Sequence, residues 1–517
     1  MAGGSDGVGV RGICDDGPMR TYVRQLVGEA HVPGGLLSLG NGEMAKRSVG
    51  SSWLDALLVS KRTFEIRDAV HTFVSLDAIE RQVVDSNPFQ RLRHIHQLAL
   101  SYLVYPGATH RRFEHSIGVM EIAGRIYDVV TRPDKLSDEV RDVVPEPGSL
   151  DHAVSRSLLR IAALCHDTGH LPFSHAAEDE LLPDGWDHER MTCEILRSEE
   201  MRAVWARMAH RPDPDQLAKI ALGPRKIEKL GLGLSFEPWE AILAEMVVGD
   251  SFGADRIDYL LRDSLHTGVA YGRFDHDRLI QTLRIMPAAT QERGQQAQKA
   301  RSEPQLGVER GGVEAAEALW LARYFMFSQV YFHPTRLVYD QHLKDFLKAW
   351  LAEGLFPTDV EGHLALTDAE IAAAMRSAAR DSGMPGHDPA RRIIERDHFR
   401  VVYQRRPEDG TFEVNALHEA ARAEFGESNI RYGGSPKRGD ADFPVRDRDG
   451  VSVPVLSLSP VLAELPVSRN AYIFAAPDLR DEVETWLDIE HDRIVQDAFD
   501  EQASEEDIET DIKVVGR

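Results

Sequence analysis

Apolar residues recur mostly at helical spacing over residues 64–286. The pattern is clearest in 117–130 and 154–165, where apolar positions three to four residues apart predict two helices. The second helix should end at His166 and Asp167, because a glycine that terminates helices follows just beyond. We therefore expect this part of the chain to be a helical block.

A polar stretch at 288–312 breaks this pattern and predicts a surface insertion or the tip of a hairpin. A further helical run follows at about 313–350. Another helix should begin at Thr367, because Thr367 and Glu370 have the spacing of a capping box.

The C-terminal part of the chain has an α+β pattern, with a turn signal at 447–450 and an acidic stretch at 497–511 typical of a frayed, solvated tail. The fold class is therefore expected to be mainly α with a smaller α+β C-terminal region. Strands are expected at 400–404, 443–445, 451–458 and 471–474. The expected parts are a loosely ordered extension at 1–62 with a short helix near 53–60, a helical core at 63–350, an α+β domain at 351–490 and an acidic tail at 491–517.

The composition narrows the class of protein. The 517 residues are 42% hydrophobic, which is enough to bury a sizeable core. Three cysteines (Cys14, Cys165 and Cys193) are too few for a disulfide framework and predict a cytoplasmic location. We see neither a membrane span nor a signal peptide. The net charge of −24 disfavours nucleic acid and anionic membrane as partners, whereas the locally basic segment 90–112 suits a small anionic ligand.

Clusters of polar residues interrupt the helical block. His166 and Asp167 together suit a divalent ion of borderline hardness, and because two ligands rarely suffice, His115 and Asp255 are the further candidates. Each histidine taken alone is more often a satisfied structural residue, but the ordered set of His, His-Asp and Asp favours a metal site. The clusters lie at 112–115, 166–175, 186–189 and 255–263.

The last cluster has its own geometry. Asp255, Tyr259 and Asp263 are spaced by four residues, so they form one stripe of a helix. Apolar residues cover most of the remaining circumference, which predicts that the stripe faces a partly enclosed place. The alternative is a solvated charged face that pairs with the neighbouring arginines.

Four segments carry a resemblance to a known family: NPFQRLRHIHQLALSYLVYPGATHRRFEHSIGVM, HDTGHLPFSH, WDHE and ADRIDYLLRDS. They resemble the HD-domain deoxynucleoside triphosphate triphosphohydrolases, a family with a human member that carries a sterile alpha motif and with bacterial relatives. The resemblance covers about 64–350 and continues more weakly to about 480, and nothing at 1–62 resembles the sterile alpha motif. It implies that 63–350 is an HD-domain catalytic core.

The resemblance implies a metal-dependent catalytic site. His175 would give a proton to the leaving 5′ oxygen, and His170 and His188 would face the phosphates. Glu178 stands where several relatives have Asp as the partner of the proton donor. The bound ion would be Zn, Fe or Mn, with Mg or Mn accompanying the substrate. The implied metal ligands are His115, His166, Asp167 and Asp255.

The resemblance also implies contacts to a nucleotide. Gln97 and Asp263 would contact the 3′ hydroxyl of the sugar, Leu98 and Tyr331 would crowd its 2′ position, and Tyr259 would line the pocket. Leu98 and Tyr331 are equally compatible with a core role, since aromatic stripes usually belong to cores. The arginines implied to clamp phosphate oxygens are Arg112, Arg256 and Arg323.

The implied activity is hydrolysis of dNTPs to deoxynucleoside and tripolyphosphate, in dNTP pool control or in phage defence. The implied partners are dNTPs, regulatory nucleotides and further copies of the chain in a tetramer or larger homo-oligomer. Two alternatives stay open. One is an HD phosphohydrolase of another nucleotide (a monophosphate, a cyclic dinucleotide or an alarmone), and the other is a nucleotide-sensing regulatory protein.

Overall fold

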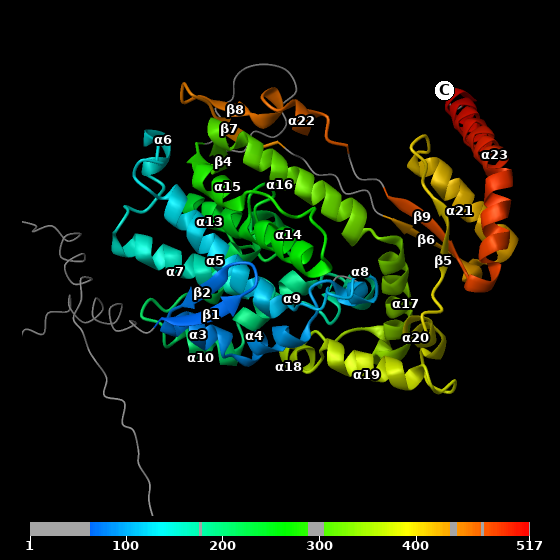
Figure 1. The fold of residues 1–517 in the computed structure, drawn as a ribbon, viewed down its shortest axis with the longest axis horizontal. Helices are drawn as coiled ribbons and strands as arrows, with labels where there is room; N and C mark the ends of the chain where they lie inside the picture. The colour runs from blue at the N-terminus through cyan, green and yellow to red at the C-terminus, as the bar shows by residue number, and fades with distance from the viewer. Residues whose placement is uncertain (1–62, 175–177, 288–303, 435–441, 467–469, 516–517) are drawn as a thin grey trace, which may run out of the picture. The chain divides into compact units, whose positions relative to one another are not determined.

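The structure, a computed structural model, describes residues 63–174, 178–287, 304–434, 442–466 and 470–515 (Figure 1). All of them belong to one packed unit, residues 54–517. The loosely ordered extension and the short helix expected near 53–60 lie outside the described residues. Among the described residues, we find no helix whose length and apolar character would let it span a membrane.

The described chain begins with an antiparallel hairpin, where a helical pattern was expected. It consists of β1 (Phe64–Asp68) and β2 (Thr72–Leu76). Alternate residues of β2, Val74 and Leu76, are buried in the main core. A period of two over only five residues is easily overlooked beside a long helical block, and this explains the difference.

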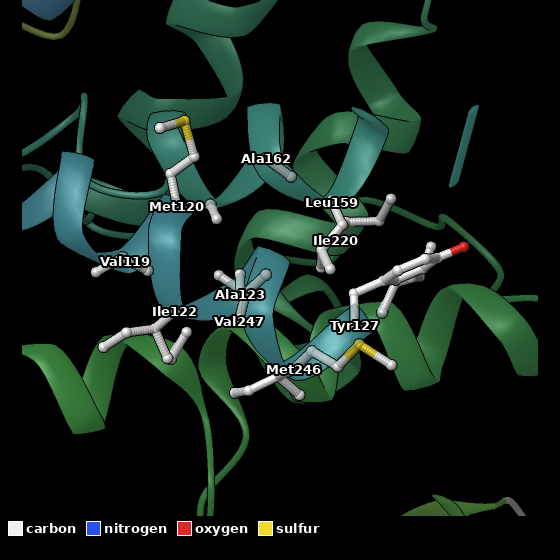
Figure 2. Close-up of a cluster of buried hydrophobic side chains, with 14 of the residues drawn as sticks. Val119, Met120, Ile122, Ala123, Tyr127, Leu159, Ala162, Ile220, Met246 and Val247 are labelled. Carbon is white, nitrogen blue, oxygen red and sulfur yellow. The ribbon is translucent and has the colours of Figure 1, made fainter. Parts of the chain in front are cut away.

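The helical block is built around α5 (Arg112–Val130), which contacts α7 (Leu150–Cys165), α13 (Pro238–Val248) and α14 (Ala254–Thr267). Figure 2 shows the side chains of α5 packed among those of α7, α11 (Pro214–Leu222) and α13. Burying each large apolar side chain contributes roughly 1.5–3 kcal/mol, so this packing fixes the helix ends that carry the polar clusters. The predictions of helices over 117–130 and 154–165 are confirmed.

Shorter helices complete this block and connect its long helices. They are α3 (Ala78–Val84), α4 (Asn87–Arg91), η1 (Leu92–His94), η2 (Ala99–Leu103), α6 (Asp138–Arg141), α8 (Glu178–Leu181), α9 (His188–Leu196), α10 (Glu199–Trp205), α12 (Pro224–Lys229) and α15 (His276–Thr282).

A four-stranded sheet lies against the helical block in the order β3-β4-β7-β8. Its strands are β3 (Leu283–Met286), β4 (Gln305–Glu309), β7 (Pro444–Arg446) and β8 (Ser452–Pro454), followed by η8 (Val455–Ser457) and α22 (Pro460–Ala463). β3 and β4 pair antiparallel, and β4 and η4 (Arg310–Gly312) occupy the end of the stretch expected as an insertion or hairpin tip. β4 pairs parallel with β7, so strands from the C-terminal region complete a sheet of the core. Phe443 and Val455 are buried in that core.

The helices after β4 include an irregular turn. The predicted run at 313–350 consists of α16 (Val313–Met326), the π-helix η5 (Phe327–Tyr331) and α17 (Pro334–Trp350), followed by η6 (Ala352–Gly354), α18 (Val360–Leu364), α19 (Asp368–Ala378) and α20 (His387–Ile394). The capping box of Thr367 and Glu370 is confirmed. Ile371 of α19 packs with Leu171 and Phe173, so residues after 350 share a core with the helical block. The boundary expected at 350/351 therefore marks no division in the packing.

A second sheet near the C-terminus has the order β5-β9-β6. It consists of β5 (Arg400–Gln404), β9 (Ala471–Ala475) and β6 (Ile430–Gly434), packed with α21 (Thr411–Phe425), η7 (Glu427–Asn429), η9 (Pro477–Leu479) and α23 (Arg480–Val515). The predicted strands at 400–404 and 471–474 are confirmed, whereas β6 was not predicted. α23 continues through the boundary at 490/491 to Val515, where a tail was expected, because its first half packs on this sheet. The fold class is mainly α with small sheets, as predicted.

Candidate metal centre and active site

The four predicted metal ligands lie at the ends of three helices. His115 is in the first turn of α5, His166 and Asp167 follow the last turn of α7, and Asp255 is in the first turn of α14. The Nε2 atom of His115 lies 3.1 Å from Asp255 Oδ1 and 3.7 Å from Asp167 Oδ2. The Nε2 atom of His166 lies 3.3 Å from Asp167 Oδ1 and 3.6 Å from Asp255 Oδ1. The structure thus brings together residues up to 140 positions apart.

The orientation of the two imidazoles suits a bound cation. His166 donates from Nδ1 to the carbonyl oxygen of Ala163 at 2.8 Å, so its Nε2 carries the lone pair. That Nε2 atom is buried and makes no hydrogen bond with any described residue. A buried acceptor without a donor is costly, whereas a divalent ion between two imidazoles and two carboxylates would satisfy it. The residues therefore fit a divalent metal.

A second layer of buried charges holds His115. Its Nδ1 donates to Asp258 Oδ2 at 2.8 Å, which turns Nε2 toward the other ligands. Asp258 also accepts from Arg262 at 2.8 and 3.0 Å and from His71 Nε2 at 2.7 Å. Arg262 in turn donates to Asp68 at 2.9 Å. The hairpin β1–β2 therefore contributes Asp68 and His71 to the network behind the metal centre.

Sequence reasoning missed this network. The available signal was the spacing of Asp258 and Arg262, which are four residues apart on the face of α14 opposite to solvent and are both fully buried. Gly118 of α5 was a further signal, because a Cβ atom there would lie 2.0 Å from Asp258 Oδ1. Only a glycine lets the ion pair approach α5 this closely.

The electrostatics of the ligands follow from burial and pairing. Burial would lower the pKa of His115, but its hydrogen bonds to Asp255 and Asp258 raise the pKa to about 10 in the absence of metal. Burial would raise the pKa of Asp167, but the charge of Arg112 holds this pKa well below its usual range. The carboxylates are therefore ionised and ready to bind a cation.

Arg112 lies directly beside the metal ligands. Its Nη1 forms an ion pair with Asp167, and its Nε donates to Ser174 Oγ at 2.9 Å. The side chain is buried, so this predicted phosphate contact sits inside the site and already orients Asp167. Asp167 Oδ1 also lies 3.3 Å from His170 Nε2.

His170 and His188 stack against each other, with ring centroids 3.9 Å apart. Glu178 Oε1 accepts from the Nδ1 of His188 at 2.5 Å and from its backbone N–H at 2.7 Å. Burial alone would lower the pKa of His188, but the bond to Glu178 raises it, while burial and the charge of Arg112 hold the pKa of His170 well below its usual range. The surroundings thus favour the charged form of the His188 ring and the neutral form of the His170 ring. The predicted partner of Glu178, His175, lies outside the described residues.

The residues predicted around the sugar form a second cluster. Tyr331, in the π-helix η5, donates to Asp263 Oδ2 at 2.6 Å, and its ring meets that of Tyr259 edge-on at 6.1 Å. Burial and the charge of Asp263 raise the pKa of Tyr331 well above its usual value, so the phenol stays protonated. His110, which sequence reasoning missed, binds the other oxygen of Asp263 at 2.8 Å.

The segment before α5 brings the remaining sugar-site residues to this cluster. The backbone N–H of Gln97 donates to the carbonyl oxygen of His110 at 3.1 Å. The Oε1 atom of Gln97 is buried and makes no hydrogen bond with a described residue, and Leu98 beside it is buried. Gln97 is thus connected to Asp263 through His110, and its buried open acceptor suits a hydroxyl-bearing ligand.

Two predicted phosphate contacts, Arg256 and Arg323, have few polar partners among the described residues. The Nε and Nη1 atoms of Arg256 are buried and make no hydrogen bond within the described residues, and its Nη2 lies 3.9 Å from Asp250. The guanidinium of Arg323 lies 5.0 Å from the ring centre of Trp320. Burial and the nearby charge of Arg256 lower the pKa of Arg323. Two adjacent, partly buried cations favour a polyanion between them.

Helices that bring two imidazoles and two carboxylates to one point define a metal-binding helical domain. Two family matches agree with this class: HD domain over residues 112–230 and HD associated region over 274–427. A crystal structure of a hypothetical protein from Aquifex aeolicus is 30% identical, covers 82% of this chain and 100% of that chain, and has a TM-score of 0.66. The chain therefore belongs to the HD-domain family.

Curated relatives match the same region. An uncharacterized protein of Methanocaldococcus jannaschii is 33% identical over 286 residues, which are 54% of this chain and 48% of that protein. Uncharacterized protein YwfO of Bacillus subtilis is 31% identical over 52% of this chain and 51% of its own length. Deoxynucleoside triphosphate triphosphohydrolase SAMHD1 of Homo sapiens is 31% identical over 43% of this chain and 36% of its length. The matches thus span about half or less of these relatives.

Proposed function

We propose that the protein is a metal-dependent phosphohydrolase that splits a dNTP with water into a deoxynucleoside and tripolyphosphate. The observation that supports this most strongly is the neighbouring pair Arg256 and Arg323. Arg256 has two buried nitrogens that make no hydrogen bond within the described residues, and it lies on α14, which also carries Tyr259 and Asp263. A monophosphate would need less positive charge than these arginines and Arg112 supply. The homology to SAMHD1 supports the same substrate class.

His115, His166, Asp167 and Asp255 would hold the divalent metal, which is Zn, Fe or Mn in our proposal. When bound, such an ion supplies Lewis acidity to the phosphate and lowers the pKa of water. Mg or Mn would accompany the triphosphate. The chain's own part is to bind and orient the substrate, with the arginines neutralising a charge that is costly to desolvate unpaired.

Selection of the sugar would depend on the cluster around Asp263. Asp263 and Gln97 would bind the 3′ hydroxyl, while Leu98 and Tyr331 would leave no room for a 2′ hydroxyl. The bond between Tyr331 and Asp263 supports this role, because it holds the phenol against the carboxylate that would bind the sugar. Tyr259 would line the pocket.

The 5′ oxygen is a poor leaving group, so a proton donor is required beside it. His175 is our candidate, with Glu178 as its partner and with His170 and His188 facing the phosphates. The hydrogen bond from His188 to Glu178, which raises the pKa of His188, supports this role because it favours the charged form of the ring beside a phosphate.

The test is to incubate the purified protein with each dNTP and each NTP in the presence of Mg²⁺ or Mn²⁺ and to separate the products by anion exchange. We expect deoxynucleoside and tripolyphosphate from dNTPs and no turnover of NTPs. Release of pyrophosphate, or equal turnover of ATP and dATP, would contradict the proposal. Turnover of a monophosphate, a cyclic dinucleotide or an alarmone alone would favour another HD phosphohydrolase.

We further propose a cytoplasmic homo-oligomer of four or more subunits that nucleotides regulate, on the basis of the family resemblance. Light scattering with and without dNTPs tests this assembly. A monomer under both conditions would contradict it.

A further inference from the structure

Two loops that carry proposed substrate contacts are held in an unusual backbone conformation. The first, which we call the sugar loop (residues 95–99), carries Gln97 and Leu98 and ends with Ala99 at a φ of 48°. The second, which we call the catalytic loop (residues 170–174), follows the proposed metal ligand Asp167 and ends with Phe173 and Ser174 at φ values of 56° and 59°. Residues with side chains rarely adopt this left-handed region, and such strain persists only where the surroundings hold it in place.

One carboxylate binds both loops. Asp368, the first residue of α19, has a buried side chain whose Oδ1 accepts from the backbone N–H of Phe173 at 2.7 Å. Its Oδ2 accepts from the backbone N–H of His96 at 2.7 Å and from Nδ1 of the same residue at 2.6 Å. Bonds to an ionised carboxylate are about twice as strong as bonds between neutral groups. Asp368 therefore joins the two loops, at the strained residue Phe173 in the second loop and at His96, three residues before the strained Ala99, in the first.

Other contacts run parallel to this bridge. Ser174 Oγ donates to the carbonyl oxygen of His96 at 2.9 Å and accepts from Arg112, which pairs with the metal ligand Asp167. The buried guanidinium of Arg91 donates to the carbonyl oxygens of His170 at 2.8 Å and Leu366 at 3.0 Å. The segment 366–368 therefore contacts the catalytic loop through both a cation and an anion.

Ring stacking adds to the connection. The imidazole of His96 lies parallel to the ring of Phe173 at 6.3 Å and stacks on Tyr102 at 5.0 Å. A shift of either loop would therefore disturb the other, since they share a stack, a hydroxyl bridge and a carboxylate.

We propose that Asp368 is a positioning residue that fixes the sugar loop relative to the catalytic loop, and that it thereby sets both turnover and the preference for deoxyribose. This inference rests on the proposed function for its kinetic consequences. Asp368 lies in the HD associated region and acts through backbone N–H groups and His96, not through the substrate. A displacement of about 1 Å at a reacting centre costs on the order of 10²-fold in rate. We expect loss of the Asp368 bonds to allow a displacement of this size between the two loops.

The main variant is Asp368→Asn, which keeps the shape but removes the charge. We expect kcat for dNTPs to fall by about 10- to 100-fold, and we expect the ratio of kcat/KM for dNTP over NTP to fall as well, because Gln97 and Leu98 are no longer fixed. Metal content should not change, since Asp368 bonds to none of the proposed ligands. An unchanged rate together with an unchanged dNTP preference would overturn the proposal.

Glu370→Gln is the matched control. Glu370 is exposed in the same first turn of α19 and caps the helix through Thr367, without contact to either loop. It should leave the rate and the sugar preference unchanged. An equal loss in this variant would show that α19 acts only as a helix, and the proposal would be wrong.

Hydrogen exchange provides a readout that does not depend on activity. In Asp368→Asn the amides of His96 and Phe173 should lose protection, whereas in Glu370→Gln they should keep it. If the wild-type protein hydrolyses no dNTP, the proposed function fails, and the exchange result still decides whether Asp368 holds the loops. If Asp368→Asn does not fold, His96→Phe keeps the ring stack but removes the Nδ1 bond, and it should reduce the sugar preference in the same direction. Wild-type preference in that variant would overturn the proposal.

Discussion

Replacing Asp258 by asparagine tests whether the buried network behind His115 supports metal binding. In the wild-type protein, Asp258 accepts from His115, His71 and Arg262, and its side chain is fully buried. The variant keeps the size of the side chain but removes its charge. His115 then loses the carboxylate that fixes its tautomer and raises its basicity.

Two magnitudes follow from this geometry. Loss of an outer-shell partner typically reduces metal affinity by about 10- to 100-fold, and we expect a loss in this range. Breaking a buried ion pair costs roughly 3–5 kcal/mol of unfolding free energy, and because Arg262 keeps its bonds to Asp68, we expect about 3 kcal/mol. The exposed pair of Arg125 and Asp277 is the matched control, and Asp277→Asn should cost less than about 1 kcal/mol without changing metal affinity.

The assay is a metal titration in competition with a coloured chelator, combined with urea unfolding of the metal-free protein. Gly118→Ala disturbs the same ion pair from α5 without removing a charge, because its Cβ would lie 2.0 Å from Asp258 Oδ1. We expect this variant to weaken metal binding in the same way. Wild-type metal affinity in both variants would refute the role of the network, whatever happens to stability.

Three further predictions concern other groups. Asp167→Ala should remove the metal and leave a soluble protein, and metal retained in elemental analysis would refute the assignment. His175→Ala should reduce turnover by roughly 10²–10⁴-fold with little change in dNTP binding, and full activity in a stable variant would reject its role as proton donor. Burial and the charges of Arg431 and Arg392 lower the pKa of His342 to about 2, so the unfolded chain binds a proton below pH about 6.5 that the folded chain does not. The free energy of unfolding of the wild type should therefore fall as the pH is lowered from 7 to 5. In His342→Gln this loss should be smaller by about 2 kcal/mol, and equal losses of the two proteins in urea unfolding would contradict this.

The sequence was sufficient for features that depend on local pattern. The helix that starts at Arg112 and the helix that ends at Cys165 follow from apolar spacing and a terminating glycine. The cap at Thr367 follows from two residues three positions apart. The four residues predicted as metal ligands sit at such helix ends, and their order along the chain with the family resemblance was enough to predict that they come together.

The features that the sequence did not predict are contacts between segments far apart in the chain. Asp68 reaches Arg262 across 194 residues, and Asp368 reaches Phe173 across 195. No periodicity signals such pairs, because the local pattern around each partner gives no information about a segment so far away in the sequence. The strand pairing of β4 with β7 was missed for the same reason, and with it the fact that C-terminal strands complete a sheet of the core.

These distant contacts share a physical character that bears on their role. Arg262 with Asp68 and Arg112 with Asp167 are buried ion pairs, and the buried carboxylate of Asp368 accepts hydrogen bonds from His96 and Phe173. Desolvation offsets most of the Coulomb attraction in such pairs, so apolar residues of the same size would often stabilise the fold equally well. What apolar residues cannot supply is a directional hydrogen bond, since only a charged, hydrogen-bonded partner fixes an imidazole tautomer or the position of a strained backbone N–H. Each of these pairs touches a proposed metal ligand or substrate-binding residue directly or through one further residue. At these places the orientation of a side chain matters most for a reaction at a bound phosphate.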